Sequence, residues 1–195
     1  YMELADLTID GKVRKVVMSA PKNGFFYVID RTNGKLISAG KIAKVTWATK
    51  IDTVTGRPVE TADTHFTNGT SFELWPSYTG AHSWRPMAFS PKTNWVEIPK
   101  LEQGAIYTDK GIDLKTWKPA VGSVGETFDA NLKNPLNFTS SLLAWNPVSQ
   151  QKAWEVKTVG GWNGGVLATA GNLVFQGQLD VRFSAYAADS GKDLW

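Results

Sequence analysis

Residues 185–195, AYAADSGKDLW, align without a gap with two earlier stretches, residues 28–38 (VIDRTNGKLIS) and residues 144–154 (AWNPVSQQKAW). Gly34 and Gly191 occupy the same position of this alignment, where a turn with positive φ favours glycine. Trp154 and Trp195 coincide at the last position, whereas the first stretch ends in Ser38. An internal repeat of this kind indicates an architecture built from similar units.

Each repeat is strand-like before and after a polar turn. Asp30 and Asn146 share the position at which a short polar side chain bonds turn amides. Two further strand-like runs precede each repeat, joined by short turns rich in Pro, Gly and Asn: residues 15–20 with 25–29, 86–89 with 95–99, and 165–170 with 173–177. Units of about 40 residues, made of successive antiparallel strands and closing on a Trp, are typical of β-propeller blades.

We therefore predict an all-β chain that holds about three propeller blades. The predicted blades are residues 1–39, 84–154 and 165–195, with an insertion at 101–138 inside the second blade and a rim excursion at 40–78. Closed propellers contain roughly four to eight blades. We expect this chain to be a segment of a larger ring that does not close alone.

The composition excludes several classes of site. The formal charge is +3 and no run of five like charges occurs, which argues against a nucleic-acid surface. Cysteine is absent, so disulfides, cysteine zinc sites and iron–sulfur clusters are excluded. The two histidines, His65 and His82, are too few for most metal sites, and no metal ligand is predicted. Motifs for dinucleotides, phosphate loops, zinc proteases and serine hydrolases are also missing.

Three blocks of the sequence carry a family resemblance: GKVRKVVMSAPKNGFFYVIDRTNGKLISA, GAHSWRPMAFSPKTNWVEIP and WNGGVLATAGNLVFQGQLDVRFSAYAADSGKDLW. In this order they resemble the pyrroloquinoline quinone (PQQ) dependent alcohol dehydrogenases, particularly the quinohaemoprotein type. The resemblance implies an eight-bladed propeller of tryptophan-docking repeats in the periplasm, with PQQ and calcium on its axis. It places the general-base Asp, the calcium ligands and any haem c domain outside this chain. No catalytic residue is therefore assigned to it.

The same resemblance implies that Lys22, Ser83, Trp84, Trp162 and Asn163 face the cofactor. A fixed cation beside a quinone oxygen stabilises the negative charge that develops during hydride transfer, which suits Lys22 in its PKNG turn. Ser83 replaces the Asn of a family block usually written His-Asn-Trp, and a hydroxyl is shorter than a carboxamide and has fewer donors.

Four of these residues have a structural alternative. Lys22 is then a solvated turn lysine, and Trp84 belongs to the core of a blade. In this alternative, residues 162 and 163 only form part of a glycine-rich segment that enters an innermost strand.

Two functions follow from the sequence. The first is a segment of a periplasmic dehydrogenase that oxidises alcohols to aldehydes with PQQ and calcium. Its partners are the remainder of the propeller, an alcohol substrate and a cytochrome electron acceptor. The second is a non-catalytic propeller scaffold that presents a protein-binding rim, because repeat geometry alone does not determine function.

Overall fold

The computed structural model describes residues 1–62, 64–65, 68–113, 115–118, 127–129 and 138–195. Every helix or strand assigned in these ranges is a β-strand. The all-β prediction is therefore confirmed.

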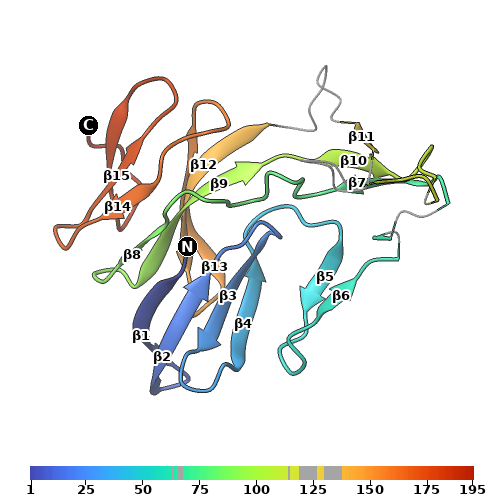
Figure 1. Ribbon diagram of the computed structural model, residues 1–195. Helices are drawn as coiled ribbons and strands as arrows, with labels where there is room; N and C mark the ends of the chain where they lie inside the picture. Colours follow the sequence, from blue (N-terminus) through green and yellow to red (C-terminus); the bar gives the residue numbers. More distant parts are fainter. Residues whose placement is uncertain (63, 66–67, 114, 119–126, 130–137) are drawn as a thin grey trace.

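The first sheet contains four antiparallel strands in chain order (Figure 1). They are β1 (Glu3–Ile9), β2 (Lys12–Ser19), β3 (Phe25–Asp30) and β4 (Leu36–Lys41). The turn between β1 and β2 consists of Asp10 and Gly11, whose φ angles are 52° and 73°. Two consecutive positive φ angles are what a two-residue hairpin turn requires, and an Asp-Gly pair adopts them readily.

The second and third sheets repeat this meander. The second sheet has the order β13-β12-β9-β8, from β8 (Ala88–Ser90), β9 (Trp95–Glu102), β12 (Thr139–Asn146) and β13 (Gln151–Thr158). The third sheet contains β14 (Val166–Ala168), β15 (Leu173–Gly177) and β16 (Phe183–Ala187). A bridge between Tyr186 and Asp193 extends the third sheet where the last repeat turns back.

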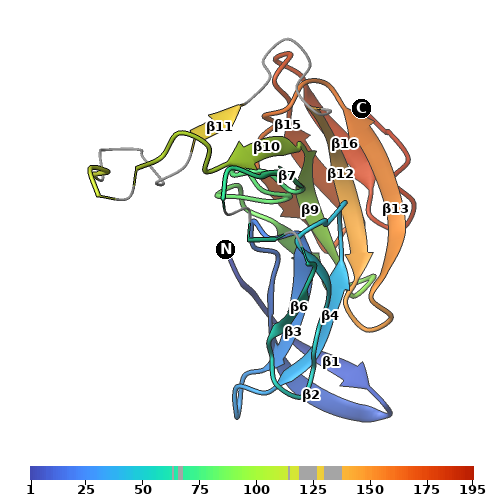
Figure 2. The ribbon, with the colours of Figure 1, turned by 90° about the vertical axis from the view of Figure 1, so that its right-hand side faces the viewer.

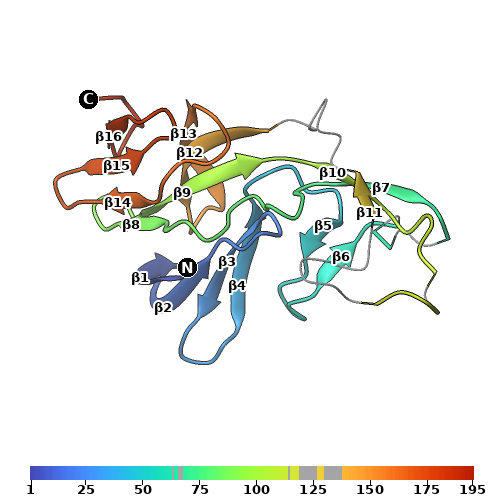
Figure 3. The same cartoon turned by 45° about the horizontal axis from the view of Figure 1, so that its top comes forward.

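The insertion and the rim excursion contain strands, whereas the sequence predicted loops. β10 (Ala105–Thr108) lies in the insertion and pairs with β7 (Ser71–Leu74) of the excursion, and β11 (Thr127–Asp129) completes this sheet. β5 (Ala48–Ile51) and β6 (Pro58–Glu60) form a separate hairpin. These elements project from the end of the molecule opposite β14–β16 (Figure 3). Their short strands carry little periodicity, and β7 and β10 meet only through tertiary pairing, which local patterns do not reveal.

The second sheet lies between the other two (Figures 1 and 2). One buried cluster fills its interface with the first sheet and includes Met18, Phe26, Ile98, Leu143 and Trp145. Another fills its interface with the third sheet and includes Leu142, Ala144, Trp154, Val174 and Tyr186. Adjacent residues of β12 thus enter different clusters, as the twofold alternation of a strand buried on both faces requires.

The repeat positions make equivalent contacts between sheets. The Trp154 indole nitrogen donates to the carbonyl oxygen of Ala188 at 2.8 Å, and a Cβ built on Gly191 would lie 2.6 Å from the Trp154 ring. In the preceding interface, Ser38 takes the position of Trp154, and its hydroxyl accepts a hydrogen bond from the Gln150 amide at 2.9 Å. A large side chain therefore docks on glycine in one interface, and a small one meets glutamine in the other.

The turns of the repeats confirm the predicted roles of their polar residues and glycines. Asp30 Oδ1 accepts from the amide of Thr32, and Asn146 Oδ1 accepts from the amide of Val148, both at 2.9 Å. Gly34 and Gly191 have φ angles of 75° and 68°.

Glu97 is an acidic residue at the largely apolar interface between the second and third sheets. It pairs with Ala88 and Ala144, so it shares their face toward the third sheet. Its side chain is fully buried, and neither carboxylate oxygen has a hydrogen-bond partner. Burial raises the pKa of Glu97 to about 8, and the charge of Glu3 adds to this effect.

Candidate functional site

Lys22 lies in the turn between β2 and β3. The turn is closed by Asn23, whose side-chain oxygen accepts from the amide of Phe25 at 3.1 Å, and by Gly24, which has a φ of 89°. The Lys22 side chain is exposed, and its Nζ donates to the carbonyl oxygen of Tyr78 at 3.1 Å. The rim excursion that contains Tyr78 therefore orients this ammonium.

His82 connects this turn to the segment that precedes β8. Its imidazole is 2% exposed. Nδ1 lies against the carbonyl oxygen of Ala20, and Nε2 lies 2.7 Å from the carbonyl oxygen of Arg85. Burial lowers the pKa of His82, although both backbone contacts oppose that shift. His82 thus positions the neighbouring residues and is not offered to a ligand.

Lys22, Ser83 and Trp84 line one open depression of about 430 Å³. Ser19, Ala20, Pro21, His82 and Tyr1 complete its lining. Trp84 is 68% exposed, so it does not belong to the core formed by the described sheets. Three of the five residues predicted to face a cofactor are therefore brought together, although they come from segments about 60 positions apart.

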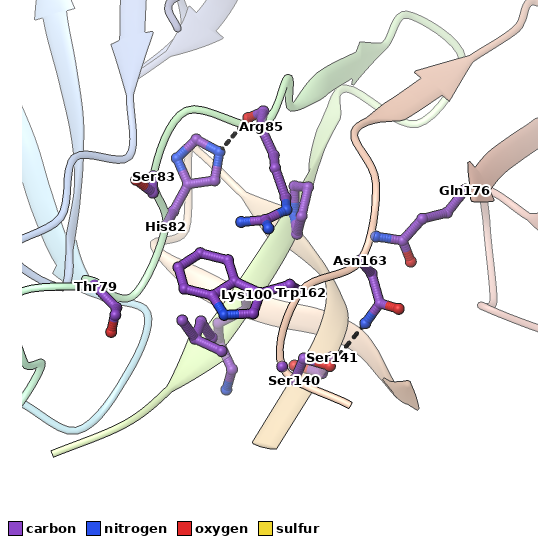
Figure 4. A pocket seen from close by; sticks show the side chains of 13 residues that line it. Thr79, His82, Ser83, Arg85, Lys100, Ser140, Ser141, Trp162, Asn163 and Gln176 are labelled. Carbon is purple, nitrogen blue, oxygen red and sulfur yellow. Dashed lines mark hydrogen bonds between the residues drawn. The ribbon is translucent and has the colours of Figure 1, made fainter. Parts of the chain in front are cut away.

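Arg85 packs on Trp84, which lines this depression, and itself lines a smaller cavity, which is drawn in Figure 4. Its guanidinium carbon lies 4.5 Å from the centre of the Trp84 ring and 4.3 Å from that of Trp162. The small cavity is lined by Arg85 and Trp162 together with His82 and Ser83, which also line the depression. The sequence analysis assigned no role to Arg85. The available signal was a cationic residue flanked by Trp and Pro shortly before the strand-like run that forms β8.

Trp162 and Asn163 have different environments. Trp162 is partly exposed, packs edge-on against Phe138 and lines the small cavity. Asn163 is 5% exposed. Its amide nitrogen donates to Ser140 at 2.8 Å and to Thr158 at 2.9 Å, and its oxygen accepts from the amide of Leu179 at 2.9 Å. Asn163 therefore holds the loop before β14 through its amide.

A second polar cavity, of about 540 Å³, was not anticipated from the sequence. In it, the buried Nζ of Lys100 lies 2.9 Å from Glu102 and 2.6 Å from Glu155. Burial raises the pKa of Glu155, but hydrogen bonds from Lys100, Ser141 and Lys152 outweigh it and hold that pKa at about 2. This network is internally neutralised, so it stabilises the sheet rather than offering a free charge.

Metal ligands do not gather in the part of the chain that the structure describes, where no group of three or more His, Asp or Glu side chains could hold an ion. Within the same residues, no helix is long and apolar enough to cross a bilayer.

Comparison with known proteins gives close relatives. No family model matches the chain. In sequence it is 51% identical over 192 residues to quinohaemoprotein alcohol dehydrogenase ADH IIB of Pseudomonas putida. This match covers 98% of this chain and 28% of that protein. In structure it matches quinohaemoprotein alcohol dehydrogenase ADHIIG of Pseudomonas putida with a TM-score of 0.91 and 42% identity, over 100% of this chain and 30% of that one.

A europium-containing methanol dehydrogenase is also similar, with a TM-score of 0.86 and 28% identity. The match covers 100% of this chain and 34% of that one. The chain thus spans about 30% of the length of the relatives that it matches.

Proposed function

The chain belongs to the family of quinohaemoprotein alcohol dehydrogenases, and from this premise we propose that it is a segment of a PQQ-dependent enzyme that oxidises alcohols to aldehydes. In this proposal the three sheets are consecutive blades of an eight-bladed propeller, and the remainder of the ring lies elsewhere in the full-length protein. The Trp154 contact with Gly191, repeated in altered form by Ser38 and Gln150, supports a blade-to-blade docking pattern.

Exposed apolar side chains on the two outer sheets support further blades. Leu4 and Val13 of the first sheet are 59% and 70% exposed, and Leu167 and Phe183 of the third sheet are 61% and 56% exposed. Apolar groups on sheet faces are normally covered in a soluble protein. Neighbouring blades would cover them.

The residues present fit PQQ, which is a flat, anionic quinone. The exposed indole of Trp84 offers an apolar face, Lys22 a cation and Ser83 a hydroxyl, all on one depression. PQQ, when bound, supplies an electrophilic carbonyl carbon that accepts a hydride equivalent from the alcohol. Lys22 stabilises the negative charge on the quinone oxygen, because a cation held in place needs no reorganisation during the reaction. Ser83 donates one hydrogen bond, directly or through water.

The other components of the proposal come from outside the described residues. The general base and the calcium ligands are assigned to other blades, as the family resemblance implies. A cytochrome is proposed as the electron acceptor, haem c as a group carried elsewhere in the full-length protein, and the periplasm as its location. The quinohaemoprotein names of the relatives support the haem-linked part of this proposal.

The convergence of Lys22, Ser83 and Trp84 carries the proposal, and Lys22 tests it. The full-length protein is reconstituted with PQQ and calcium, and dye reduction by ethanol is followed for wild type, Lys22→Ala and the control Lys12→Ala at the exposed start of β2. We expect a loss of about a hundredfold in kcat for Lys22→Ala, comparable to the loss of one charge-stabilising donor, and no change for Lys12→Ala. Equal turnover by all three proteins removes Lys22 from the mechanism. A wild type without PQQ-dependent turnover of any alcohol refutes the function.

A further inference from the structure

Arg85 is a buried cation without an anionic partner. It is 9% exposed, and its guanidinium makes no ion pair or hydrogen bond with any described residue. Lys100 is similarly buried, with 8% of its side chain exposed, but it contacts two carboxylates. Burying a charge is costly unless it is paired. Arg85 therefore lacks the kind of carboxylate partner that offsets the burial of Lys100.

The two indoles leave the hydrogen-bonding edge of Arg85 available. The guanidinium lies over the rings of Trp84 and Trp162, and an indole offers no lone-pair acceptor for its N–H groups. Its N–H groups lie in the plane of the guanidinium and form a rigid fork that matches a carboxylate. The rings therefore hold the fork in one orientation without consuming its donors.

The space beside Arg85 limits the size of the group that it binds. The cavity that it lines with Trp162 has a volume of about 10 Å³, which holds about one water-sized group. Figure 4 shows the guanidinium directed into this cavity, beside the Trp162 ring. One oxygen of a terminal carboxylate fits there, whereas an aromatic ring must remain in the larger depression.

From these observations we infer that Arg85 is a carboxylate-binding residue that anchors an acidic ligand at the junction of the depression and the small cavity. The inference rests on the proposed function, because that function supplies the two sources of a carboxylate. One source is the cofactor, since PQQ is a tricarboxylic acid. The other is an alcohol substrate that also carries a carboxylate. Burial lowers the pKa of Arg85, but an arginine stays charged at neutral pH, so the pairing is available there.

The test separates the two sources in the full-length protein. Three variants are compared with wild type: Arg85→Gln, which removes the charge; Arg85→Lys, which keeps the charge but loses the fork; and Arg57→Gln, an exposed control. The dissociation constant of PQQ for the apoprotein is measured by quenching of tryptophan fluorescence. The ratio of kcat/KM for 6-hydroxyhexanoate to that for 1-hexanol is measured with the reconstituted enzyme. Circular dichroism and the urea midpoint report whether each variant folds.

If the cofactor supplies the carboxylate, Arg85→Gln raises the PQQ dissociation constant at least about tenfold, as expected for a lost charged partner, and Arg85→Lys raises it less. If the substrate supplies it, PQQ affinity is unchanged and the kcat/KM ratio falls by about the same factor. Unchanged values of both in folded Arg85→Lys and Arg85→Gln overturn the inference.

A wild type that neither binds PQQ nor oxidises alcohols refutes the proposed function separately. The carboxylate site is then tested by titration with pyridine-2,4-dicarboxylate. Binding that is weakened by Arg85→Gln, but not by Arg57→Gln, supports the site. Identical binding by wild type and both variants overturns it.

Discussion

Replacement of the buried Glu97 by Gln is expected to change the pH dependence of stability. In the folded protein the pKa of Glu97 is about 8, against an ordinary value of 4.5, because burial penalises the carboxylate. Below pH 4.5 the carboxyl is protonated in both folded and unfolded chains. Between pH 4.5 and 8 the folded protein holds a proton that the unfolded chain has lost, so the free energy of unfolding falls as the pH rises.

The size of this effect follows from the same two pKa values. They differ by about 3.5, and each pKa unit corresponds to about 1.4 kcal/mol. Stability therefore declines by about 5 kcal/mol from pH 4.5 to above pH 8, and about 3 kcal/mol of this decline is complete at pH 7. Glu97→Gln has nearly the same shape and no ionisable group. The substitution therefore removes the pH-dependent part of the free energy of unfolding, while a buried polar group stays in place.

The assay is urea unfolding of the full-length protein, followed by tryptophan fluorescence at pH 5 and pH 8. We expect the free energy of unfolding of Glu97→Gln, relative to that of wild type, to increase by several kcal/mol from pH 5 to pH 8. This increase is on the order of the decline that linkage predicts for wild type. The exposed turn variant Asp10→Asn is the control, and it should follow wild type. A constant difference between Glu97→Gln and wild type at both pH values would show that Glu97 is not a buried, unpaired acid, and would refute the reasoning.

Two further substitutions test the packing between and within the sheets. Gly191→Ala should destabilise the protein by about 2–4 kcal/mol in urea unfolding, because it combines a positive φ with a Cβ 2.6 Å from the Trp154 ring. Gly34→Ala, where φ is 75° and nothing lies within 4 Å, should cost only about 1 kcal/mol, so equal losses would contradict the docking contact. Lys100→Met should cost about 3 kcal/mol at pH 7 by leaving two partly buried carboxylates short of a partner. That cost should shrink as the pH falls through the Glu155 pKa of about 2, where wild type loses the same interaction; a cost that does not depend on pH would count against this network.

The repeats are local in sequence, and this explains why most of the strand pattern was predictable. A strand, a turn with Gly34 or Gly191 and a returning strand or single bridge are encoded within eleven consecutive residues. The positive φ of both glycines and the Asp30 turn bond follow from short-range sterics and hydrogen bonding. The paired strands β7 and β10 belong to different excursions, and no local signal specifies their pairing.

The candidate site was only partly predictable, because a family resemblance names positions and not their partners. Lys22, Ser83 and Trp84 were identified from their sequence blocks, and the structure brings them to one depression. Asn163 was assigned to a ligand, but folding places Ser140, Thr158 and Leu179 around its amide. Such contacts depend on which loops meet in space.

The amino-acid sequence by itself determined the all-β class and the repeated turn chemistry, since both depend on residue types at short, regular spacing, and three of its blocks carried the resemblance to the family. Only the tertiary structure decided the electrostatic character of individual side chains. Arg85, Glu97 and Lys100 are ordinary charged residues in the sequence. After folding, one is an unpaired cation over two indoles, one an isolated buried acid and one the centre of an ion network. The reason is physical: the energy of a charge depends on its burial and on the partners that packing brings to it.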